Sequence, residues 1–140
     1  MDDGFELDRF LAAQDRVWPE VVAELAAGAK RTHWMWFVFP QLAGLGSSPM
    51  AVRYALGSLA EARAYLAHPV LGERLREATR LMLRHAGRPA EAVLGGIDAM
   101  KFRSSMTLFA AAAPAEALFG EAIAAFFDGP DPRTLALLGA

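Results

Sequence analysis

The residues best suited to chemistry gather in one short stretch, KRTHWMWFVFPQ, which covers positions 30 to 41. Lys30, Arg31 and His33 stand on one side of an aromatic cluster that includes Trp36, and Gln41 stands on the other side. Cationic side chains bind phosphate or carboxylate groups, and aromatic rings stack on planar bases. The stretch therefore predicts a pocket for a small anionic ligand with a planar part.

A purely structural explanation of the same residues stays open. Basic side chains commonly occupy the last turn of a helix, where they complement the helix dipole. Lys30 and Arg31 would then form a solvated helix end, and His33 would donate a hydrogen bond to a backbone carbonyl.

A second group of polar residues lies far along the chain. Asp98, Lys101 and Ser105 are spaced at i, i+3 and i+7, which places them on one face of a helix. Lys101 and Lys30 are the only lysines among 14 lysines and arginines, which hints at a need for a compact ammonium group. The alternative is that Asp98 caps the helix, Lys101 pairs with it, and Ser105 fills a gap. If both groups line one cleft, these side chains should converge there: Lys30, His33, Trp36, Gln41, Tyr54 and Lys101.

The segment GLGSSPM, residues 44 to 50, predicts a loop because glycine and serine cluster there without periodicity. Its unhindered backbone N–H groups lead into a helix start and suit anions in general. It lacks the spacing and the lysine of a phosphate-binding P-loop. The loop therefore supports an anion site without identifying a nucleotide.

Several other kinds of site have no support in the sequence. The chain has no cysteine, which excludes disulfides and thiolate chemistry. His33, His68 and His85 lack a partner at helical ligand spacing, so we expect no metal site and no cofactor. For His68 and His85, positions at helix ends are the simpler explanation. No hydrolase or glycosidase arrangement is recognisable, and whether the protein is an enzyme stays open.

The charge balance narrows the choice of partners. The formal net charge is −2 and the pI is about 5.9, which argues against nucleic-acid binding. The N-terminal sequence MDDGFELDRF lacks the basic and apolar regions of a signal peptide. No apolar run approaches the roughly 20 residues that span a bilayer. We expect a cytoplasmic protein with no membrane partner.

The composition predicts an all-α fold. Hydrophobic residues make up 54% of the chain, and alanine, which favours helix, supplies much of that fraction. β-branched residues are scarce, which argues against sheets. We expect one compact domain over residues 1–140, with about seven to eight helices in an orthogonal or irregular bundle.

The first helices follow from apolar spacing and prolines. A stripe from Leu7 to Trp18 predicts one helix, and Pro19 opens a second segment that Gly28 closes. The two pieces are either one kinked helix or two abutting helices. Residues 33–39 fit either a helix or a strand; we favour a short helix that ends at Phe39, before a proline. In both geometries the segment is apolar on nearly all sides, so we place it in the centre of the domain, with Trp34, Phe37 and Val38 in the core.

Caps and breakers define the middle of the chain. Ser48-Pro49 starts a short helix that runs through Tyr54 or Leu56, and the capping box at residues 58–61 starts another that runs to Leu66. Residues 71–82 predict the longest helix, which Gly87 ends. Residues 89–94 predict a brief helical turn that two glycines terminate.

The last third predicts three more helices. Asp98 caps the first, whose inward stripe includes Phe102, Met106, Phe109 and Ala113. Pro114 ends it and opens the next, with Leu118, Ala122 and Phe126 facing inward. Asp131-Pro132 starts the terminal helix.

The run from KRTHWMWFVFPQLAGLGSSPM through residue 77, together with Asp98, Lys101 and RSSMTLFAAAAP, resembles a bacterial family. It is similar to the domain-of-unknown-function family numbered eighteen-ten, whose members are often labelled calpastatin automatically. The resemblance extends from Leu7 to Leu138 and implies a small all-α cytoplasmic protein. It implies no established activity and no catalytic residues, and nothing in the chain supports the calpastatin label.

Two functions from different classes follow from these observations. The first is binding or processing of a small anionic, nucleotide-like ligand, similar to ADP-ribose, between the 30–41 segment and the 98–105 helix. The alternative is a non-enzymatic interaction module, such as a homodimer that buries an apolar face. A Trp36 that lines a pocket favours the first, and a Trp36 on a flat patch favours the second.

Overall fold

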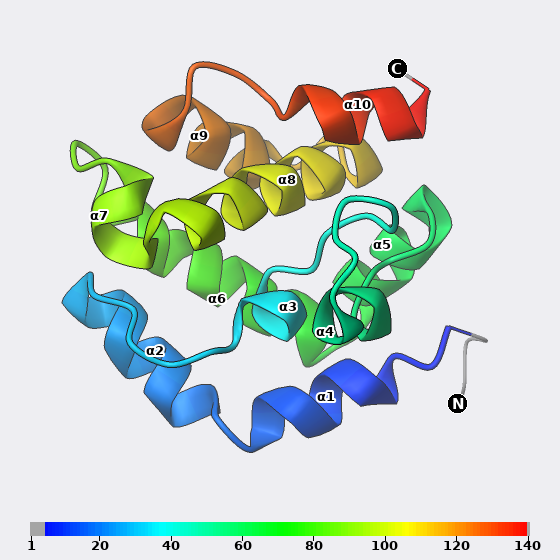
Figure 1. The fold of residues 1–140 in the computed structure, drawn as a ribbon, viewed down its shortest axis with the longest axis horizontal. Coiled ribbons are helices and arrows are strands. Elements are labelled where there is room, and N and C mark those ends of the chain that lie inside the picture. The colour runs from blue at the N-terminus through cyan, green and yellow to red at the C-terminus, as the bar shows by residue number, and fades with distance from the viewer. Residues whose placement is uncertain (1–4, 140) are drawn as a thin grey trace.

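Ten helices, of which α8 is the longest, make up the fold in a computed structural model that describes residues 5–139 (Figure 1). No strand occurs in that part of the chain, and the only β pairing is an isolated bridge between Leu42 and Leu56. The helices are α1 (Asp8–Asp15), α2 (Trp18–Ala27), α3 (Met35–Val38), α4 (Pro49–Arg53), α5 (Leu59–Ala67), α6 (Leu71–Leu83), α7 (Ala90–Leu94), α8 (Gly96–Ala112), α9 (Ala117–Phe126) and α10 (Pro132–Leu138). The all-α prediction is confirmed, and seven of the ten helices have seven residues or more.

The core of the molecule forms around α8, which packs against α5, α7, α9, α10 and α3. Its inward stripe is as predicted at Phe102, Met106 and Phe109, which are all fully buried. Phe102 packs edge-on against Phe39, with 4.9 Å between the ring centroids. The aromatic segment that precedes Pro40 therefore packs directly on the central helix.

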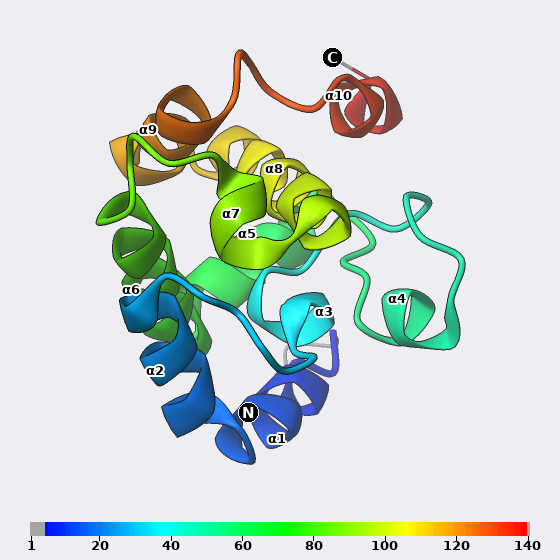
Figure 2. The same cartoon turned by 60° about the vertical axis from the view of Figure 1, so that its left-hand side comes forward.

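The short helix α3 sits where the sequence predicted it, in the middle of the domain (Figure 2). Trp34, Phe37 and Val38 are buried as expected, while Trp36 on the opposite side is partly exposed. The buried amide of Gln14 donates to the carbonyl of Phe37 at 2.6 Å, which anchors the end of the helix. One face of this segment belongs to the core, and Trp36 lies on the other.

Several helix boundaries have the local causes that the sequence indicates. Ser48 and Ser58 accept hydrogen bonds from the backbone N–H groups three residues later, and Asp131 does the same for α10. Gly28 ends α2 with a φ of 70°, a left-handed conformation that favours glycine. A Cβ at Gly28 would also lie 2.5 Å from the guanidinium of Arg88 and 2.8 Å from the ring of His85, so both side chains would have to move.

Two predictions about α6 and α8 were wrong. The longest helix is α8, with 17 residues, whereas α6 has 13 residues and ends before Gly87. Asp98 does not cap α8, because the helix already begins at Gly96 and Gly95 is its N-cap, with a φ of 88°. The glycine pair that was expected only to end α7 also starts α8, so Asp98 lies within the first turn.

Smaller differences concern α4 and α9. Helix α4 ends at Arg53, one residue before the earliest predicted end. The fully buried face of α9 is Phe119, Ala122 and Ile123. Of the predicted stripe, Ala122 is buried as expected, whereas Leu118 and Phe126 pack against the core but are only partly buried.

Candidate functional site

The segment between α2 and α3 is held by one carboxylate. Glu24 accepts hydrogen bonds from the backbone N–H groups of Arg31 (2.7 Å) and Thr32 (3.0 Å) and from the Thr32 hydroxyl (2.7 Å). The indole N–H of Trp34 donates to the same carboxylate at 3.1 Å. Glu24 therefore sets the path of the chain from α2 into the aromatic segment.

The pKa of Glu24 reflects this arrangement. Burial by itself raises the pKa, because it disfavours the charged carboxylate. The hydrogen bonds from Arg31, Thr32 and Trp34 outweigh burial and lower the pKa of Glu24 from 4.5 to about 2. The carboxylate that orders this segment is therefore fully ionised at neutral pH.

The two lysines of the chain meet at one carboxylate. The ammonium group of Lys30 lies 2.8 Å from one oxygen of Asp98, and that of Lys101 lies 3.4 Å from the other. Each ammonium also lies over an indole ring: Lys30 over Trp34 at 4.9 Å and Lys101 over Trp36 at 4.8 Å. The 30–41 segment and the start of α8 are thus joined by a Lys–Asp–Lys bridge.

The two lysines differ in how many of their N–H donors are left free to bind a ligand. The side chain of Lys30 is only 5% exposed, and its ammonium also donates to the carbonyl of Thr32. The side chain of Lys101 is 20% exposed and makes the longer ion pair. Lys30 is therefore committed to the protein, whereas Lys101 keeps N–H groups available at the surface.

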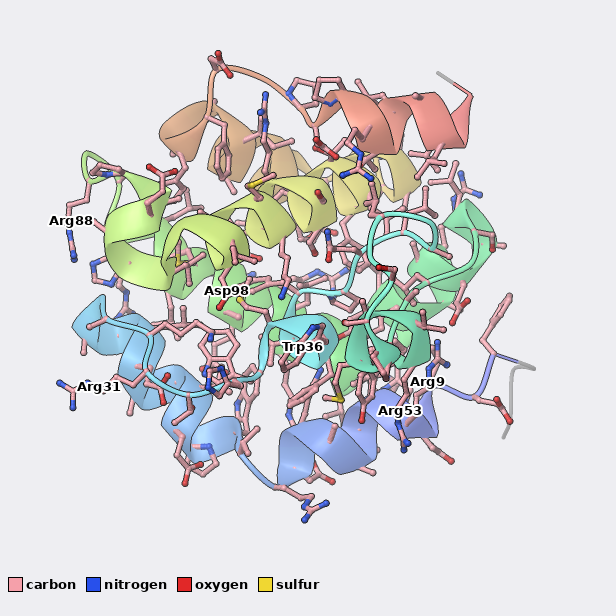
Figure 3. All side chains as sticks on the ribbon, viewed as in Figure 1. Arg9, Arg31, Trp36, Arg53, Arg88 and Asp98 are labelled. Carbon is pink, nitrogen blue, oxygen red and sulfur yellow. The ribbon has the colours of Figure 1, made fainter. Side chains whose placement is uncertain are left out.

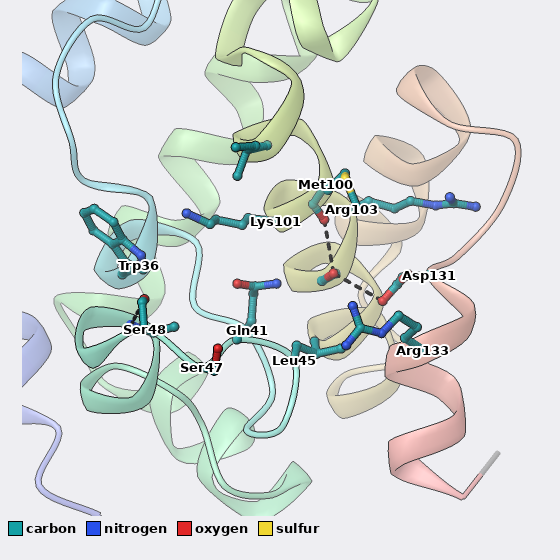
Figure 4. A pocket seen from close by; sticks show the side chains of 14 residues that line it. Trp36, Gln41, Leu45, Ser47, Ser48, Met100, Lys101, Arg103, Asp131 and Arg133 are labelled. Atoms are coloured by element: carbon teal, nitrogen blue, oxygen red, sulfur yellow. Dashed lines mark hydrogen bonds between the residues drawn. The ribbon is translucent and has the colours of Figure 1, made fainter.

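One cavity of about 410 Å³, which we call the loop cavity, lies beside this bridge. Trp36, Gln41 and residues 45–48 form one side of it, and α8 and the start of α10 form the other. Figure 4 shows Gln41 and Arg133 pointing into this space from the loop and from α10, while Lys101 on α8 extends toward Trp36. Its volume is in the range of small-molecule sites.

The charged groups around the loop cavity are not equally available. Arg103 points away and binds the carbonyl of Gly129 at 2.9 Å and the carboxylate of Asp128 at 3.2 Å (Figure 4). Asp131 caps α10 and accepts from Ser104 and from the backbone and hydroxyl of Thr134. Burial raises the pKa of Asp131, but these hydrogen bonds and the nearby guanidinium lower it overall.

Arg133 has no such commitment. Its side chain is exposed, and it makes no hydrogen bond or ion pair with any residue between positions 5 and 139. The side chains of Gln41 and Ser47 likewise have no hydrogen-bond partner within that range. The loop cavity therefore combines one unpaired guanidinium with several free hydrogen-bond donors.

A second cavity of about 390 Å³, which we call the lysine cavity, lies on the other side of Trp36. Lys30, His33 and Asp98 line it, together with the tryptophans and the glycine pair at the start of α8. Three residues, Trp36, Ile97 and Lys101, line both cavities. The two cavities therefore adjoin, and Trp36 and Lys101 form the wall between them.

The candidate residues from the sequence fall into two sets. Six of them line the cavities: Lys30, His33, Trp36, Gln41, Asp98 and Lys101. The other three do not. Arg31 points outward from the loop after α2, away from Trp36 (Figure 3). Tyr54 is buried against Phe10 and Phe37, and Ser105 is fully buried within the core.

These three exceptions have physical causes. Only the backbone N–H of Arg31 is used, by Glu24, so its side chain is left to solvent. Asp98 lies in the first turn of α8, where the helix still borders the cavity. Ser105 lies two turns further along the same face, where the helix is already surrounded by the core. Its hydroxyl has no hydrogen-bond partner in the described residues, although the alternative that it fills a gap between helices agrees with its burial.

Two other features of the site are absent from the candidate residues. Arg133 was missed, because the Asp131-Pro132 start locates α10 but nothing in the sequence places α10 beside α3. The loop of residues 46–48 does line the loop cavity, although it had been given only a general affinity for anions. No group of three or more His, Asp or Glu residues in the described part of the chain is arranged to hold a metal ion.

The histidines away from the site act at helix ends. One ring nitrogen of His68 accepts hydrogen bonds from the N–H groups of Val70 and Leu71 at 3.2 Å, next to the start of α6. His85 bonds through its Nε2 to the carbonyl of Leu25 at 2.7 Å, which ties the end of α2 to the end of α6. Within residues 5–139 no helix combines the length and the apolarity of a membrane span.

Comparisons with known proteins agree with this architecture. A family model described as "Protein of unknown function (DUF1810)" matches residues 4–138. The crystal structure of the conserved hypothetical protein Rv1873 from Mycobacterium tuberculosis is 54% identical in sequence, with a TM-score of 0.96, and the match covers 99% of each chain. No curated protein matches the chain. These relatives support the fold and the family, and their descriptions name no activity.

Proposed function

The chain belongs to the DUF1810 family, whose description names no activity, and we propose from its cavities that it binds a small anionic, nucleotide-like ligand. The anionic group lies in the loop cavity, where Arg133 and Lys101 provide positive charge. The planar part of the ligand packs against Trp36. A molecule such as ADP-ribose has both features and is the ligand class that we favour.

The observation that carries this proposal is the charge of the cavities relative to the chain. The whole chain has a formal net charge of −2. Lys30, Lys101 and Arg133 line the two cavities against two carboxylates, Asp98 and Asp131, while Arg103 points away and is paired with Asp128. A local positive excess in an acidic protein favours an anion at this place over the rest of the surface.

The position of Trp36 supports the same proposal. Its indole lines both cavities and is partly exposed, so it is available to a ligand without forming a flat surface patch. Aromatic rings at such positions stack on planar groups, which adds specificity to charge attraction. A cytoplasmic location agrees with a nucleotide-like ligand and stays a prediction.

A thermal-shift series tests the proposal, with ADP-ribose, AMP and phosphate as ligands and uncharged adenosine as the ligand control. Saturation at a hundred times the dissociation constant stabilises the fold by about 2.7 kcal/mol, which raises the melting temperature by several degrees. We expect Arg133→Gln to weaken AMP binding about tenfold, because a charge-assisted hydrogen bond contributes roughly 1.5–3 kcal/mol.

Arg31→Gln is the matched control, since it removes the same charge from a side chain outside both cavities. We expect it to change affinity by less than about twofold, because exposed charges act weakly at a distance. Equal losses in the two variants, or no stabilisation by any anionic ligand, would contradict the proposal.

One specific observation supports the alternative that the protein is an interaction module. Ile97 and Met100 are 75% and 67% exposed and lie one turn apart on α8. Both also line the loop cavity, so they equally suit the apolar part of a ligand. Light scattering over a range of protein concentrations separates the two functions. If the protein forms a homodimer through this face, its average molecular mass in solution should fall toward that of the monomer on dilution and in an Ile97→Asp variant.

A further inference from the structure

The two adjoining cavities differ in the hydrogen-bonding capacity that the protein leaves unused. In the loop cavity the spare groups are largely donors: the guanidinium of Arg133, the ammonium of Lys101 and the hydroxyl of Ser47. The carboxylate there, Asp131, is held as the cap of α10 by three hydrogen bonds on one of its oxygens, and the nearby guanidinium of Arg103 offsets its charge. This cavity is suited to an acceptor-rich, negatively charged group.

The lysine cavity has a carboxylate with capacity to spare. Asp98 takes one ammonium group on each oxygen, and an ionised carboxylate offers about four lone-pair sites. Two acceptor positions therefore remain on a group that lines the cavity. His33, which is exposed and has no side-chain partner in residues 5–139, adds a ring nitrogen on the same cavity.

A negatively charged ligand group would face Asp98 directly in the lysine cavity, and like charges at short range repel. A neutral group with several hydroxyls would not, since each hydroxyl can donate to the carboxylate. The two lysines hold Asp98 in place, so its free lone pairs have a fixed direction. The chemistry of this cavity thus selects hydroxyl donors rather than a second anion.

We propose that the lysine cavity binds the vicinal diol of a sugar, with Asp98 as the acceptor, while the phosphate of the same ligand lies in the loop cavity. This inference rests on the proposed function and narrows it to ligands that carry a ribose-like sugar next to a phosphate. Lys101 faces both cavities and lies where the sugar meets the phosphate. Trp36, on the same wall, packs against the junction.

The test is an NMR titration of the protein with ribose 5-phosphate, 2-deoxyribose 5-phosphate and inorganic phosphate. The chain has three tryptophans, so the indole N–H signals of Trp34 and Trp36 report on the cavities and that of Trp18 serves as an internal reference. We expect ribose 5-phosphate to bind about tenfold more tightly than the deoxy sugar, the loss expected for one hydrogen bond to a charged group. This comparison needs only the unmodified protein.

The variant Asp98→Asn separates the subsite from general charge effects. It frees two lysines, so inorganic phosphate should bind equally well or more tightly, while the preference for ribose over deoxyribose should disappear. Asp15→Asn is the matched control, because it also removes one carboxylate and one ion pair, on α1 and outside both cavities. It should keep the preference.

The outcomes distinguish the two levels of the proposal. Equal affinity of the unmodified protein for the two sugar phosphates, or a preference that survives in Asp98→Asn, overturns the diol subsite and leaves the anion site standing. If none of the three ligands shifts the Trp36 signal, the proposed function itself is contradicted.

Discussion

The loop cavity and the lysine cavity share a wall but differ in whether the charged side chains around them are already paired within the protein. Around the lysine cavity the main charges are already paired: Lys30 is nearly buried and lies 2.8 Å from Asp98. Around the loop cavity Arg133 is exposed and has no partner among residues 5–139. Paired, buried charges contribute mainly to structure, whereas an unpaired cation in a cavity is available to a ligand.

This contrast explains why the aromatic segment has two roles. Trp34 packs in the core and donates to Glu24, so its position is fixed before any ligand arrives. Trp36 projects from the other side of α3, where the ammonium of Lys101 lies 4.8 Å from its ring centroid. The rigid side orients the open side, as preorganised sites require.

The largest expected effect separates these two tryptophans. Trp34→Ala should destabilise the protein by roughly 3–5 kcal/mol, because it removes a fully buried aromatic side chain. Trp36→Ala should cost only roughly 1–2 kcal/mol, in line with partial burial, and should abolish binding of the planar ligand. Urea unfolding of both variants measures the difference. Equal destabilisation would show that Trp36 is also a core residue.

A smaller effect is expected from the carboxylates that order the two cavities. Glu24→Gln should destabilise the protein by roughly 1–3 kcal/mol at neutral pH, since an ionised acceptor of four hydrogen bonds becomes a neutral amide. Asp131→Asn should cost only a few tenths of a kcal/mol, because asparagine is also a good N-cap. Urea unfolding at pH 7 ranks the two.

The pH dependence of the Glu24 effect has a defined sign. Its pKa is about 2 in the folded protein and 4.5 without these contacts, so the unfolded chain binds the proton first as the pH falls. The stabilisation is complete above pH 4.5 and is lost between there and about pH 2. The difference between the unmodified protein and Glu24→Gln should therefore narrow at pH 3; an unchanged difference would contradict the assignment.

The sequence predicted the helices wherever a local signal marks a boundary. Pro19, Ser48 and Asp131 act through their own backbone or the next turn, so their effects are visible without tertiary structure. The prediction that Asp98 caps α8 was wrong because the helix starts earlier, after Gly95. That start requires a positive φ at Gly95, which glycine allows but which the sequence alone does not reveal.

The site was predictable only within each segment. The types of Lys30, Lys101 and Trp36 indicated an anionic, planar ligand, and the structure brings them together at Asp98 and at the shared wall. The position of Arg133 on the same cavity as Trp36 and Lys101 depends on how α10 packs on α8, which no local pattern encodes. Ser105 was wrongly included for a related reason. Its spacing places it on the same helical face as Asp98, but spacing does not reveal which part of that face is buried in the core.

A crystal structure of the protein with ADP-ribose tests the central claim most directly. We predict phosphate oxygens within hydrogen-bond distance of Arg133 and Lys101 in the loop cavity, and ribose hydroxyls against Asp98 in the lysine cavity. A ligand bound elsewhere on the surface, or one whose phosphates avoid both cations, would contradict the account.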